Sequence, residues 1–376
     1  MATSGRVLVL SAAIGEGHDL PARWLAAGLA EEDPAIEVEI ADGLAAMGRL
    51  SERVVLGGSS FESVWGNRLF DLTHWLITEV APIRALAGVV GVALGGRGLR
   101  RLIAERRADV VVSTYPGVTE VLGRLRRRRR LAVPVASAIT DLASLRYWAH
   151  PGVDLHLVTH PESIAEVRAI AGARTDVVAV RGLNDPAFLT ERPRADARRA
   201  LGLPPDGPVV VVSGGGWGVG DLAGAIDTVL AVDGAVAVVM CGRNDAVRER
   251  LAARHAGEPR VRLLGFTDRV ADLFAAADAL VHSTAGLTVL EAMARGCPVI
   301  SYGWGRGHIR ANNRAYRRFG LADVATTRPA LAAALRRALA ARREPDRSQA
   351  ELPTAAGVVR TRFGLGAAEQ QIAHSG

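Results

Sequence analysis

Residues 279–313 read ALVHSTAGLTVLEAMARGCPVISYGWGRGHIRANN. The pattern predicts a buried strand over 279–282, a tight turn, an amphipathic helix that ends at Gly296, and a second buried strand over 298–302. A strand, a helix and a strand in this order form the repeating unit of a parallel α/β sheet. The segment therefore indicates an α/β fold.

The turn of this segment is a candidate anion site. It places Ser283, Thr284, Ala285 and Gly286 at a helix N-terminus, where free backbone N–H groups and the helix dipole attract negative charge. One helical turn later, Glu291 is placed to bind a ribose hydroxyl. Together these groups would describe a nucleotide site. The alternative is an ordinary capped helix, which is the more common origin of an isolated Ser-Thr-x-Gly.

The composition is that of a globular protein with a large core. The 376 residues are 49% hydrophobic, which is enough for two domains of ordinary size. The two cysteines, Cys241 and Cys297, lie in apolar runs and are typical of small buried side chains, not of a disulfide or metal site. No signal peptide is evident after Met1, and the weakly polar stretch 85–96 is about half the ~20 residues that span a membrane. We expect a cytoplasmic protein, either free or peripheral on the inner face of the cell membrane.

The charge points to an anionic partner. The formal net charge is +7, and much of the excess is arginine, at Arg124 and in the run from Arg126 to Arg130. Such a run suits an anionic membrane surface or nucleic acid. A solvated helix end is an equally good interpretation of the same residues.

Apolar runs alternate with helical patterns along almost the whole chain. The runs are rich in valine and continuous, which is typical of parallel strands covered on both faces. Parallel strands imply right-handed crossovers through the intervening helices. The predicted strands are 6–12, 36–41, 109–114, 134–140, 153–159 and 176–181, followed by 208–213, 235–241, 261–266, 279–283 and 298–302.

Two such series are too many for one compact sheet. We predict two doubly wound Rossmann-like domains facing a cleft, in which ligands bind at the C-terminal ends of the strands. The first domain covers 1–182 and the second 208–350, joined by a Pro-rich linker over 183–207. The segment 351–376 is expected to be helical and to pack back towards the first domain.

One segment of the first domain, about 44–107, contains no clear strand. It carries aromatic and aliphatic residues followed by arginines, and we interpret it as inserted helices. That composition suits a helical face at a membrane interface. The alternative is a helical layer packed on its own domain.

Two loops of the first domain carry candidate catalytic groups. Gly15 and Gly17 allow a ligand to approach the backbone, and His18 follows them where a helix begins. Near neutral pH a histidine there can act as a general base or bind an anionic group. Asp141 follows a buried strand directly, so its carboxylate is placed to accept a proton or to orient His18; helix capping is the alternative.

Three loops of the second domain are candidates for binding a diphosphate, sugar or base. Gly214, Gly215 and Gly216 form a glycine-rich turn after a strand, whose backbone N–H groups can surround a diphosphate. Arg243 is placed to reach a phosphate, and Phe266 to flank a base. No Asp-x-Asp motif and no His/Cys cluster with metal spacing occurs, so helix dipoles and side chains must stabilise a leaving diphosphate.

Taken in order, these motifs resemble the monogalactosyl- and diglucosyl-diacylglycerol synthases of glycosyltransferase family 28. The peptidoglycan (lipid II) N-acetylglucosaminyltransferase is a more distant relative. The similarity extends from about 7 to 325. Its landmarks are GEGH at 15–18, DVVVSTYP at 109–116, TDL at 140–142 with Trp148, VMCGRN at 239–244, LGF at 264–266 and GLTVLEA at 286–292.

The resemblance implies the two-domain fold called GT-B. A UDP-sugar, which is a co-substrate and not a cofactor, would bind the second domain and the acceptor, a lipid or lipid-linked hydroxyl, the first. Glu291 would hold the ribose, and Thr288 with Leu287 and the turn before it would hold the diphosphate. His18 and Asp141 would lie near the reacting carbon. Family 28 enzymes invert the anomeric centre, here without a metal.

The chain differs from the family at the residues that are expected to bind the sugar. The relatives carry Gly-Gln-Glu or Gln-Gln before a conserved Asn, whereas this chain has Gly307, His308 and Ile309 before Asn312. His308 and Asn312 remain candidate sugar ligands, but Ile309 cannot form a side-chain hydrogen bond. The resemblance therefore does not identify the sugar.

Three other functions remain open. The acceptor of the transferase is alternatively a soluble natural product. A UDP-sugar epimerase on the same fold is less favoured, because that reaction needs no acceptor loop. Nucleic-acid binding rests only on the arginine run, without a docking motif, and we expect no nucleic-acid partner.

Overall fold

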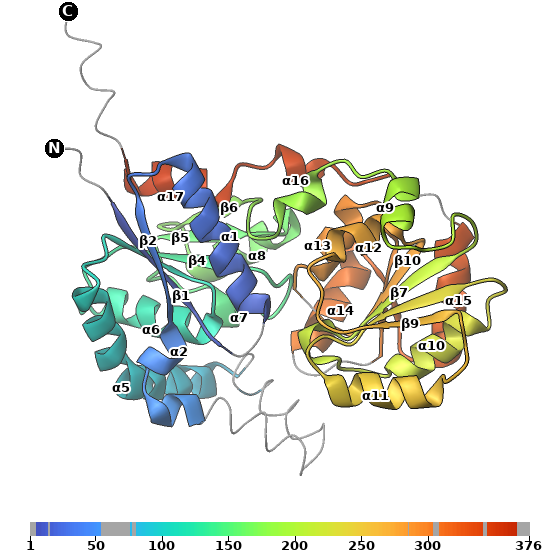
Figure 1. Cartoon of the computed structure of the whole chain (residues 1–376). Helices are drawn as coiled ribbons and strands as arrows, with labels where there is room; N and C mark the ends of the chain where they lie inside the picture. Colours follow the sequence, from blue (N-terminus) through green and yellow to red (C-terminus); the bar gives the residue numbers. More distant parts are fainter. Residues whose placement is uncertain are drawn as a thin grey trace, which may run out of the picture. The chain divides into compact units, whose positions relative to one another are not determined.

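The computed structural model describes residues 5–13, 16–53, 76, 80–284, 286–303, 308–340 and 344–366 (Figure 1). Its contacts divide the chain into two compact units. The first unit is Met1–Asp185 with Leu352–Gly376, and the second is Pro186–Glu351. The two units are described separately below.

The first unit contains a six-stranded parallel sheet in the order β2-β1-β3-β4-β5-β6. The chain reverses its direction of winding at β1, because β2 and β3 pair with opposite sides of that strand. All strands predicted for the first half are present. They are β1 (Arg6–Ser11), β2 (Glu37–Asp42), β3 (Val110–Ser113), β4 (Val135–Ile139), β5 (Leu155–Val158) and β6 (Asp176–Ala179).

Helices cover both faces of this sheet. On one face, strand side chains such as Val9 and Val112 pack against α1 and α17, and on the other face side chains such as Leu10 and Val111 pack against α5 and α6. The C-terminal segment reaches the first unit through a bridge between Arg181 and Thr354. The helices are α1 (Glu16–Glu32), α2 (Gly43–Ala46), α5 (Ala81–Glu105), α6 (Pro116–Arg127), α7 (Leu145–Trp148), α8 (Ile164–Ala171) and α17 (Ala355–Phe363).

The inserted segment predicted at about 44–107 is helical where the structure describes it. It forms α2 and the long helix α5, whereas residues 54–75 and 77–79 lie outside the described part. In the described part of the chain, no helix is both long and apolar enough to cross a membrane.

The second unit contains another six-stranded parallel sheet, in the order β12-β11-β10-β7-β8-β9. Here the winding reverses between β7 and β10, in the strand order of the Rossmann fold. The sequence missed β12, a three-residue strand at the edge of the sheet. The strands are β7 (Val209–Ser213), β8 (Val236–Met240), β9 (Val261–Leu264), β10 (Ala279–His282), β11 (Val299–Tyr302) and β12 (Asp323–Ala325).

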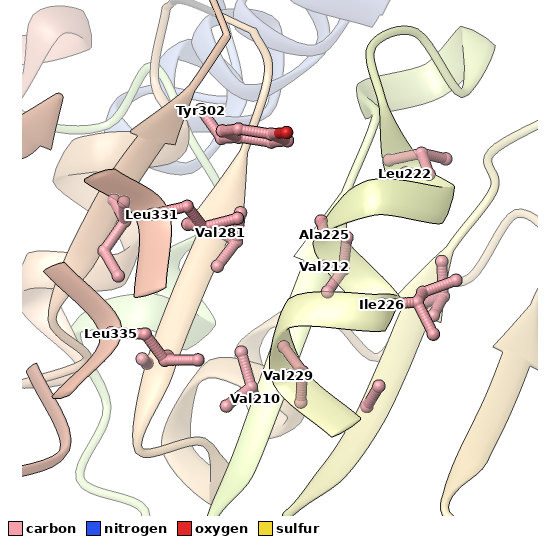
Figure 2. Close-up of a cluster of buried hydrophobic side chains, with 14 of the residues drawn as sticks. Val210, Val212, Leu222, Ala225, Ile226, Val229, Val281, Tyr302, Leu331 and Leu335 are labelled. Carbon is pink, nitrogen blue, oxygen red and sulfur yellow. The ribbon is translucent and has the colours of Figure 1, made fainter. Parts of the chain in front are cut away.

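The core of the second unit lies between this sheet and two helices. Val210, Val212 and Val281 of the sheet pack against Ile226 on α10 and Leu335 on α15, all nearly inaccessible to water (Figure 2). The helices of this unit are α9 (Arg194–Ala200), α10 (Leu222–Leu230), α11 (Asp245–Arg254), α12 (Val270–Ala276), α13 (Thr288–Ala294), α14 (His308–Phe319), α15 (Arg328–Ala340) and α16 (Ser348–Glu351).

Most of the predicted linker, from Pro186 onward, groups with the second unit. The reason is a buried ion pair that the sequence does not reveal. The guanidinium of Arg198 on α9 is 1% exposed and donates to the Asp278 carboxylate at 2.7 Å and to the Ala276 carbonyl at 3.0 Å. A buried arginine with all these partners holds α9 firmly against the sheet.

Candidate functional site

The predicted site residues form two groups, one in each unit. Within each group, some residues follow strands next to a reversal of winding: His18 follows β1 in the first sheet, and Gly214 and Ser283 follow β7 and β10 in the second. Such positions are the usual ligand sites of doubly wound sheets. Of the candidates, Gly15, Ala285 and the segment 304–307 lie outside the described residues, as does the side chain of His308.

In the first unit, His18 is held in one orientation by the loop after β3. Its Nδ1 lies 2.9 Å from the Thr114 carbonyl oxygen, and the Thr114 hydroxyl donates to the His18 carbonyl oxygen at 2.9 Å. The ring also contacts Tyr115 edge-on, with the ring centroids 5.1 Å apart. Gly17 has open space where a side chain would begin. The fixed ring and the open glycine fit a ligand-binding loop.

Trp148 connects Asp141 to the same histidine ring. The indole N–H of Trp148 donates to the Asp141 carboxylate at 3.1 Å, and the Trp148 and His18 ring centroids are 5.8 Å apart. Trp148 itself is 2% exposed. The structure thus brings the two predicted catalytic groups into one cluster and adds Trp148, whose position between them the sequence did not indicate.

In the second unit, the glycine-rich loop is tightly packed. A Cβ atom on Gly214 would lie 2.5 Å from the Gly218 backbone, and one on Gly215 would lie 2.7 Å from the Thr284 side chain. Gly215 and Gly218 have φ values of 65° and 61°, in the left-handed region that glycine accepts at little cost. Close packing of loops therefore accounts for part of the glycine content.

Two backbone amides of this loop are already engaged. The Gly214 amide donates to the Met240 carbonyl at 3.4 Å, and the Gly215 amide donates to the Ser213 hydroxyl at 3.2 Å. In this conformation neither is directed at a ligand, because each already has an acceptor. The predicted diphosphate contact of Gly216 stays a prediction.

The turn after β10 is anchored to its neighbours in the same way. The Ser283 amide donates to the Ser213 carbonyl at 3.2 Å, and the Thr284 amide points to Nδ1 of His282 at 3.4 Å. His282 is fully buried, and burial lowers its pKa to about 4. A neutral imidazole can accept the amide, so the turn is fixed by a histidine that the sequence did not single out.

Helix α13 begins later than the sequence predicts. Its first residue is Thr288, preceded by Leu287 as the capping residue without a side-chain hydrogen bond. Gly286 has a φ of 82° and open space around it. Glu291 lies in the first turn of the helix and is half-buried. The predicted anion turn is therefore a loop that leads into the helix, and its first residues are not at the helix N-terminus itself.

The loops after β8 and β9 meet through a cation–π contact. The Arg243 guanidinium lies over the Phe266 ring, 3.7 Å from its centroid, and Phe266 is 51% exposed. An arginine stacked in this way covers one face of the ring. The structure brings these two candidates together, and a base flanked by Phe266 would have to meet Arg243 as well.

Asn312 is not exposed. Its side chain is 0% accessible on α14, next to Asn313, whose Oδ1 accepts a hydrogen bond from the Ser301 hydroxyl at 2.6 Å. A buried amide supports packing between α14 and β11 in the described structure. A contact of Asn312 with a sugar stays a prediction that requires the side chain to become accessible.

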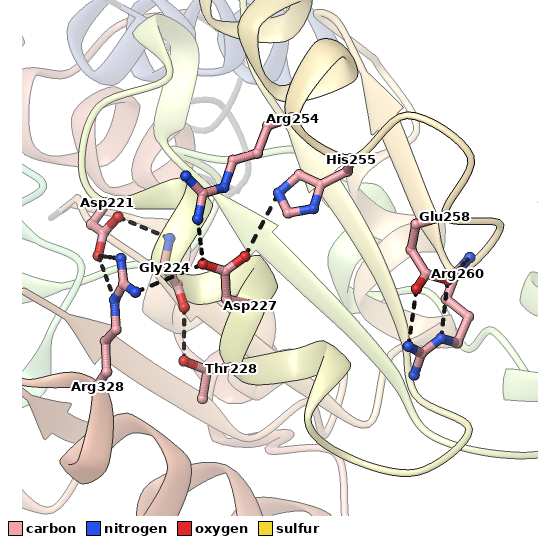
Figure 3. A network of polar contacts seen from close by, with 9 residues as sticks. All are labelled: Asp221, Gly224, Asp227, Thr228, Arg254, His255, Glu258, Arg260 and Arg328. Carbon is pink, nitrogen blue, oxygen red and sulfur yellow. Dashed lines mark hydrogen bonds and ion pairs between the residues drawn. The ribbon is translucent and has the colours of Figure 1, made fainter.

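A polar cluster that the sequence did not indicate lies at the end of the glycine-rich loop, where α10 begins (Figure 3). Asp221 caps α10 through the Gly224 amide at 2.8 Å, accepts a hydrogen bond from the Tyr302 hydroxyl at 2.9 Å, and pairs with Arg328 at 3.5 Å. An aspartate before a helical pattern signals the cap. The partners on β11 and α15 are 81 and 107 residues away, beyond any local pattern.

A cavity of about 750 Å³ opens at the opposite edge of the second sheet, where β10 and β11 begin. Three of its arginines are engaged: Arg192 pairs with Asp272 at 2.8 Å, Arg194 pairs with Asp278, and Arg295 donates to backbone carbonyls of the segment before α9. These contacts are structural. The described residues contain no group of three or more His, Cys, Asp or Glu side chains placed to hold a metal ion.

Comparisons with known proteins agree with this arrangement. Residues 90–184 match the family model of monogalactosyldiacylglycerol (MGDG) synthase, and residues 208–341 match that of glycosyl transferases group 1. The chain is 25% identical over 308 residues to the processive diacylglycerol beta-glucosyltransferase of Bacillus subtilis (strain 168), covering 80% of this chain and 78% of that protein.

Two solved structures have a similar fold. The glycosyltransferase SnogD from Streptomyces nogalater aligns with a TM-score of 0.57 at 16% identity, over 97% of this chain and all of that one. A putative UDP-N-acetylglucosamine 2-epimerase from Listeria monocytogenes aligns with a TM-score of 0.58 at 13% identity, over 96% and 97% of the two chains. The fold alone therefore does not separate transferases from epimerases.

Fold and family models together define the class: the chain is a glycosyltransferase with two Rossmann-like domains, the GT-B fold. The predicted fold class is confirmed. Within that class, the chain is similar to the diacylglycerol glycosyltransferases of family 28, as its motifs indicated.

Proposed function

We propose that this protein transfers a sugar from a UDP-sugar to the hydroxyl of a diacylglycerol-like lipid, with inversion at the anomeric carbon and without a metal ion. The observation that carries the proposal is the match of the first unit, where the acceptor would bind, to the MGDG synthase model over 90–184. The similarity to a processive diacylglycerol beta-glucosyltransferase over most of both chains supports the same acceptor class.

His18 is the better candidate for the general base. Because a carbonyl oxygen only accepts hydrogen bonds, the contact with Thr114 places the proton of a neutral ring on Nδ1 and leaves the lone pair on Nε2. In the proposed step, Nε2 takes the proton of the acceptor hydroxyl and the oxygen bonds to the anomeric carbon. The bond from that carbon to the diphosphate breaks, and UDP leaves with its electron pair.

A lipid acceptor requires the enzyme to reach a membrane, and α5 offers a suitable surface. Four of its large apolar side chains face outward: Leu86 is 64% exposed, and Val89, Val90 and Leu94 are each at least 40% exposed. They recur at helical spacing and form one stripe. The stripe continues into the exposed residues Arg97, Arg100 and Arg101.

Small residues on the inner side of α5 explain why these four large residues remain outside. A side chain at Gly88 would overlap Arg124 on α6, and a Cβ on Gly95 would lie 2.6 Å from Met47. The glycine side of the helix therefore fits closely against its own domain. An apolar stripe followed by arginines is the arrangement of helices that lie in the interface of an anionic membrane.

The arginine run at 126–130 is a weaker candidate for the same role. Arg126 pairs with Asp154 at 2.6 Å and donates to the Ala132 carbonyl at 2.7 Å, so it stabilises its own domain. The remaining arginines of the run, from Arg127 to Arg130, are exposed. We propose that the protein is peripheral on the inner face of the cell membrane, with α5 as its main contact.

The proposal is tested by measuring UDP release with a panel of UDP-sugars, in the presence of diacylglycerol vesicles or of vesicles without it. We expect release with at least one UDP-sugar that depends on diacylglycerol. Release that requires a soluble hydroxylated acceptor instead would contradict the lipid assignment. No release under any of these conditions would contradict the transferase proposal.

A further inference from the structure

We propose that Asp221, Tyr302 and Arg328 form a positioning cluster that fixes the exit of the glycine-rich loop at 213–220 and so sets the affinity for the diphosphate part of the donor. None of these residues was among the candidate ligands. The inference rests on the proposed function, because it assigns a UDP-sugar to the loop that the cluster holds.

The cluster connects three elements that are far apart in the sequence, and Figure 3 shows two of its members, Asp221 and Arg328. Tyr302 is the last residue of β11, and its hydroxyl donates to the Asp221 carboxylate at 2.9 Å. Arg328, the first residue of α15, pairs with that carboxylate at 3.5 Å and with Asp227, further along α10, at 3.7 Å. Tyr302 is 7% exposed, so its hydroxyl is held in place by the core around it (Figure 2).

The glycine-rich loop packs directly against the predicted phosphate turn at Ser283 and Thr284. Gly220, with a φ of 98°, lies so close to Ser283 that any side chain at 220 would overlap it. Gly215 packs in the same way against Thr284. A shift at Asp221 therefore moves the loop relative to Ser283 and Thr284. A loop whose position is fixed by packing loses less entropy on binding than a loose one.

The cluster also controls charge beside an anion site. Partial burial alone would raise the pKa of Asp221, but hydrogen bonds from the Gly224 amide and the Tyr302 hydroxyl, together with the charge of Arg328, outweigh it and hold that pKa below its ordinary value. The aspartate is therefore a full negative charge near the place assigned to a diphosphate. Arg328 compensates that charge, which would otherwise repel the ligand.

Gly224 provides a way to break the cluster without removing any of its groups. A Cβ atom at 224 would overlap the Asp221 carboxylate and lie 2.5 Å from Nε of Arg328. Its backbone is not in the left-handed region, so alanine there is otherwise favourable in a helix. Gly224→Ala should thus displace Arg328 from Asp221 while leaving every side chain of the cluster present.

The test measures the Kd of UDP by calorimetry, and the KM of donor and acceptor with kcat, for Tyr302→Phe and Gly224→Ala. We expect the UDP Kd and the donor KM to rise about 3- to 10-fold in both variants, the size of one ordinary hydrogen bond, because the cluster acts on the ligand only through the loop. The acceptor KM and kcat should stay within twofold of the wild-type values. A general loosening of the fold would change all of these quantities together.

One further variant serves as the control. Arg337→Ala removes an exposed arginine from the same helix α15, where it pairs with Asp323 at 3.2 Å, and should leave the UDP Kd unchanged.

An unchanged UDP Kd in Tyr302→Phe and Gly224→Ala, with wild-type protein that binds UDP, would overturn this inference alone. Equal losses in the donor KM, the acceptor KM and kcat would also overturn it. Wild-type protein that binds neither UDP nor a UDP-sugar would contradict the proposed function, and this inference with it.

Discussion

Thr114 and His18 are joined by two hydrogen bonds, one to the ring and one to the backbone of the histidine. The Thr114 carbonyl oxygen lies 2.9 Å from Nδ1, and the Thr114 hydroxyl lies 2.9 Å from the His18 carbonyl oxygen. Both ends of His18 are therefore fixed by the loop after β3. Because Nδ1 faces a carbonyl oxygen, it carries the proton of the neutral ring, and Nε2 is the basic atom.

The first prediction concerns His18 as the general base. His18→Ala should lower kcat by about 10²- to 10⁴-fold, the usual contribution of a positioned base, while the UDP Kd stays unchanged. Thr114→Val removes only the hydroxyl and keeps the carbonyl, so it should cost far less. If Asp141→Asn abolishes turnover while His18→Ala reduces it less than about tenfold, Asp141 is the base instead.

The second prediction concerns metal ions. Treatment with EDTA followed by gel filtration should leave the steady-state rate unchanged within twofold, because the proposed step stabilises the leaving diphosphate with protein groups alone. Adding Mg²⁺ or Mn²⁺ to the treated protein should restore nothing. A rate that falls at least tenfold and recovers with one of these ions would show that the donor needs a metal.

The third prediction concerns membrane binding through α5. Replacing Leu86 and Val90 together by Gln should weaken binding to anionic vesicles by at least tenfold, because each apolar side chain contributes up to about 1.5–3 kcal/mol when fully buried. Binding is measured by vesicle flotation. Ile40→Gln is the matched control, since Ile40 is 41% exposed on β2 of the same unit. Equal effects of the two changes would argue against α5 as the membrane contact.

The fourth prediction concerns close packing of the donor loops. Gly242 and Gly234 both have positive φ values, 62° and 66°, so alanine costs about 1–2 kcal/mol at either position. Only at Gly242 would the new side chain also overlap the Gly216 carbonyl, whereas the space around Gly234 is open. Urea denaturation should therefore show a larger loss for Gly242→Ala, by about 2 kcal/mol. Similar losses at the two positions would mean that the loops adjust freely.

The fifth prediction concerns stability in acid. Burial lowers the pKa of His160 to about 4 from its ordinary 6.5, and neither of its ring nitrogens has a hydrogen-bond partner among the described residues. Below pH 6.5 the unfolded chain takes up a proton that the folded protein does not, so stability is full above pH 6.5 and falls towards pH 4. His282 behaves alike, since burial lowers its pKa to the same value.

This dependence is measurable by urea denaturation at pH 7 and pH 5. Between pH 6.5 and 5, each such histidine should remove about 2 kcal/mol from the free energy of unfolding. His160→Leu removes one titrating group and should flatten the curve by that amount. A curve as steep as that of the wild-type protein would contradict the assignment.

The sheets could be predicted because their signal is local. Continuous valine-rich runs occur only where a strand is covered on both faces, and each predicted run forms a strand. β12 was missed because it pairs with one neighbour only and needs just three residues. The contacts of Arg198 and Tyr302 were not predictable, because their partners lie about 80 residues away.

The orientation of α5 could not be predicted from the sequence, for a different reason. Its pattern of glycine, valine and leucine is apolar all round, and burial of the large residues is the usual expectation for such a helix. In the structure only some of the large residues are buried, such as Leu99 and Ile103, whereas Leu86, Val89, Val90 and Leu94 are exposed. Gly88, Gly95 and Gly98 take positions on the packed side, where each lies against atoms that a side chain would displace. Which side of such a helix is buried depends on what it packs against, and the sequence of the helix alone does not contain that information.

The most direct test of the central claim is analysis of the product by mass spectrometry and proton NMR. Wild-type protein is incubated with the UDP-sugar that gives the fastest UDP release and with vesicles that contain diacylglycerol. We expect one hexosylated diacylglycerol for each UDP formed, with the anomeric configuration opposite to that of the donor. Free sugar or an epimerised UDP-sugar as the only product, with no glycosylated lipid, would contradict it.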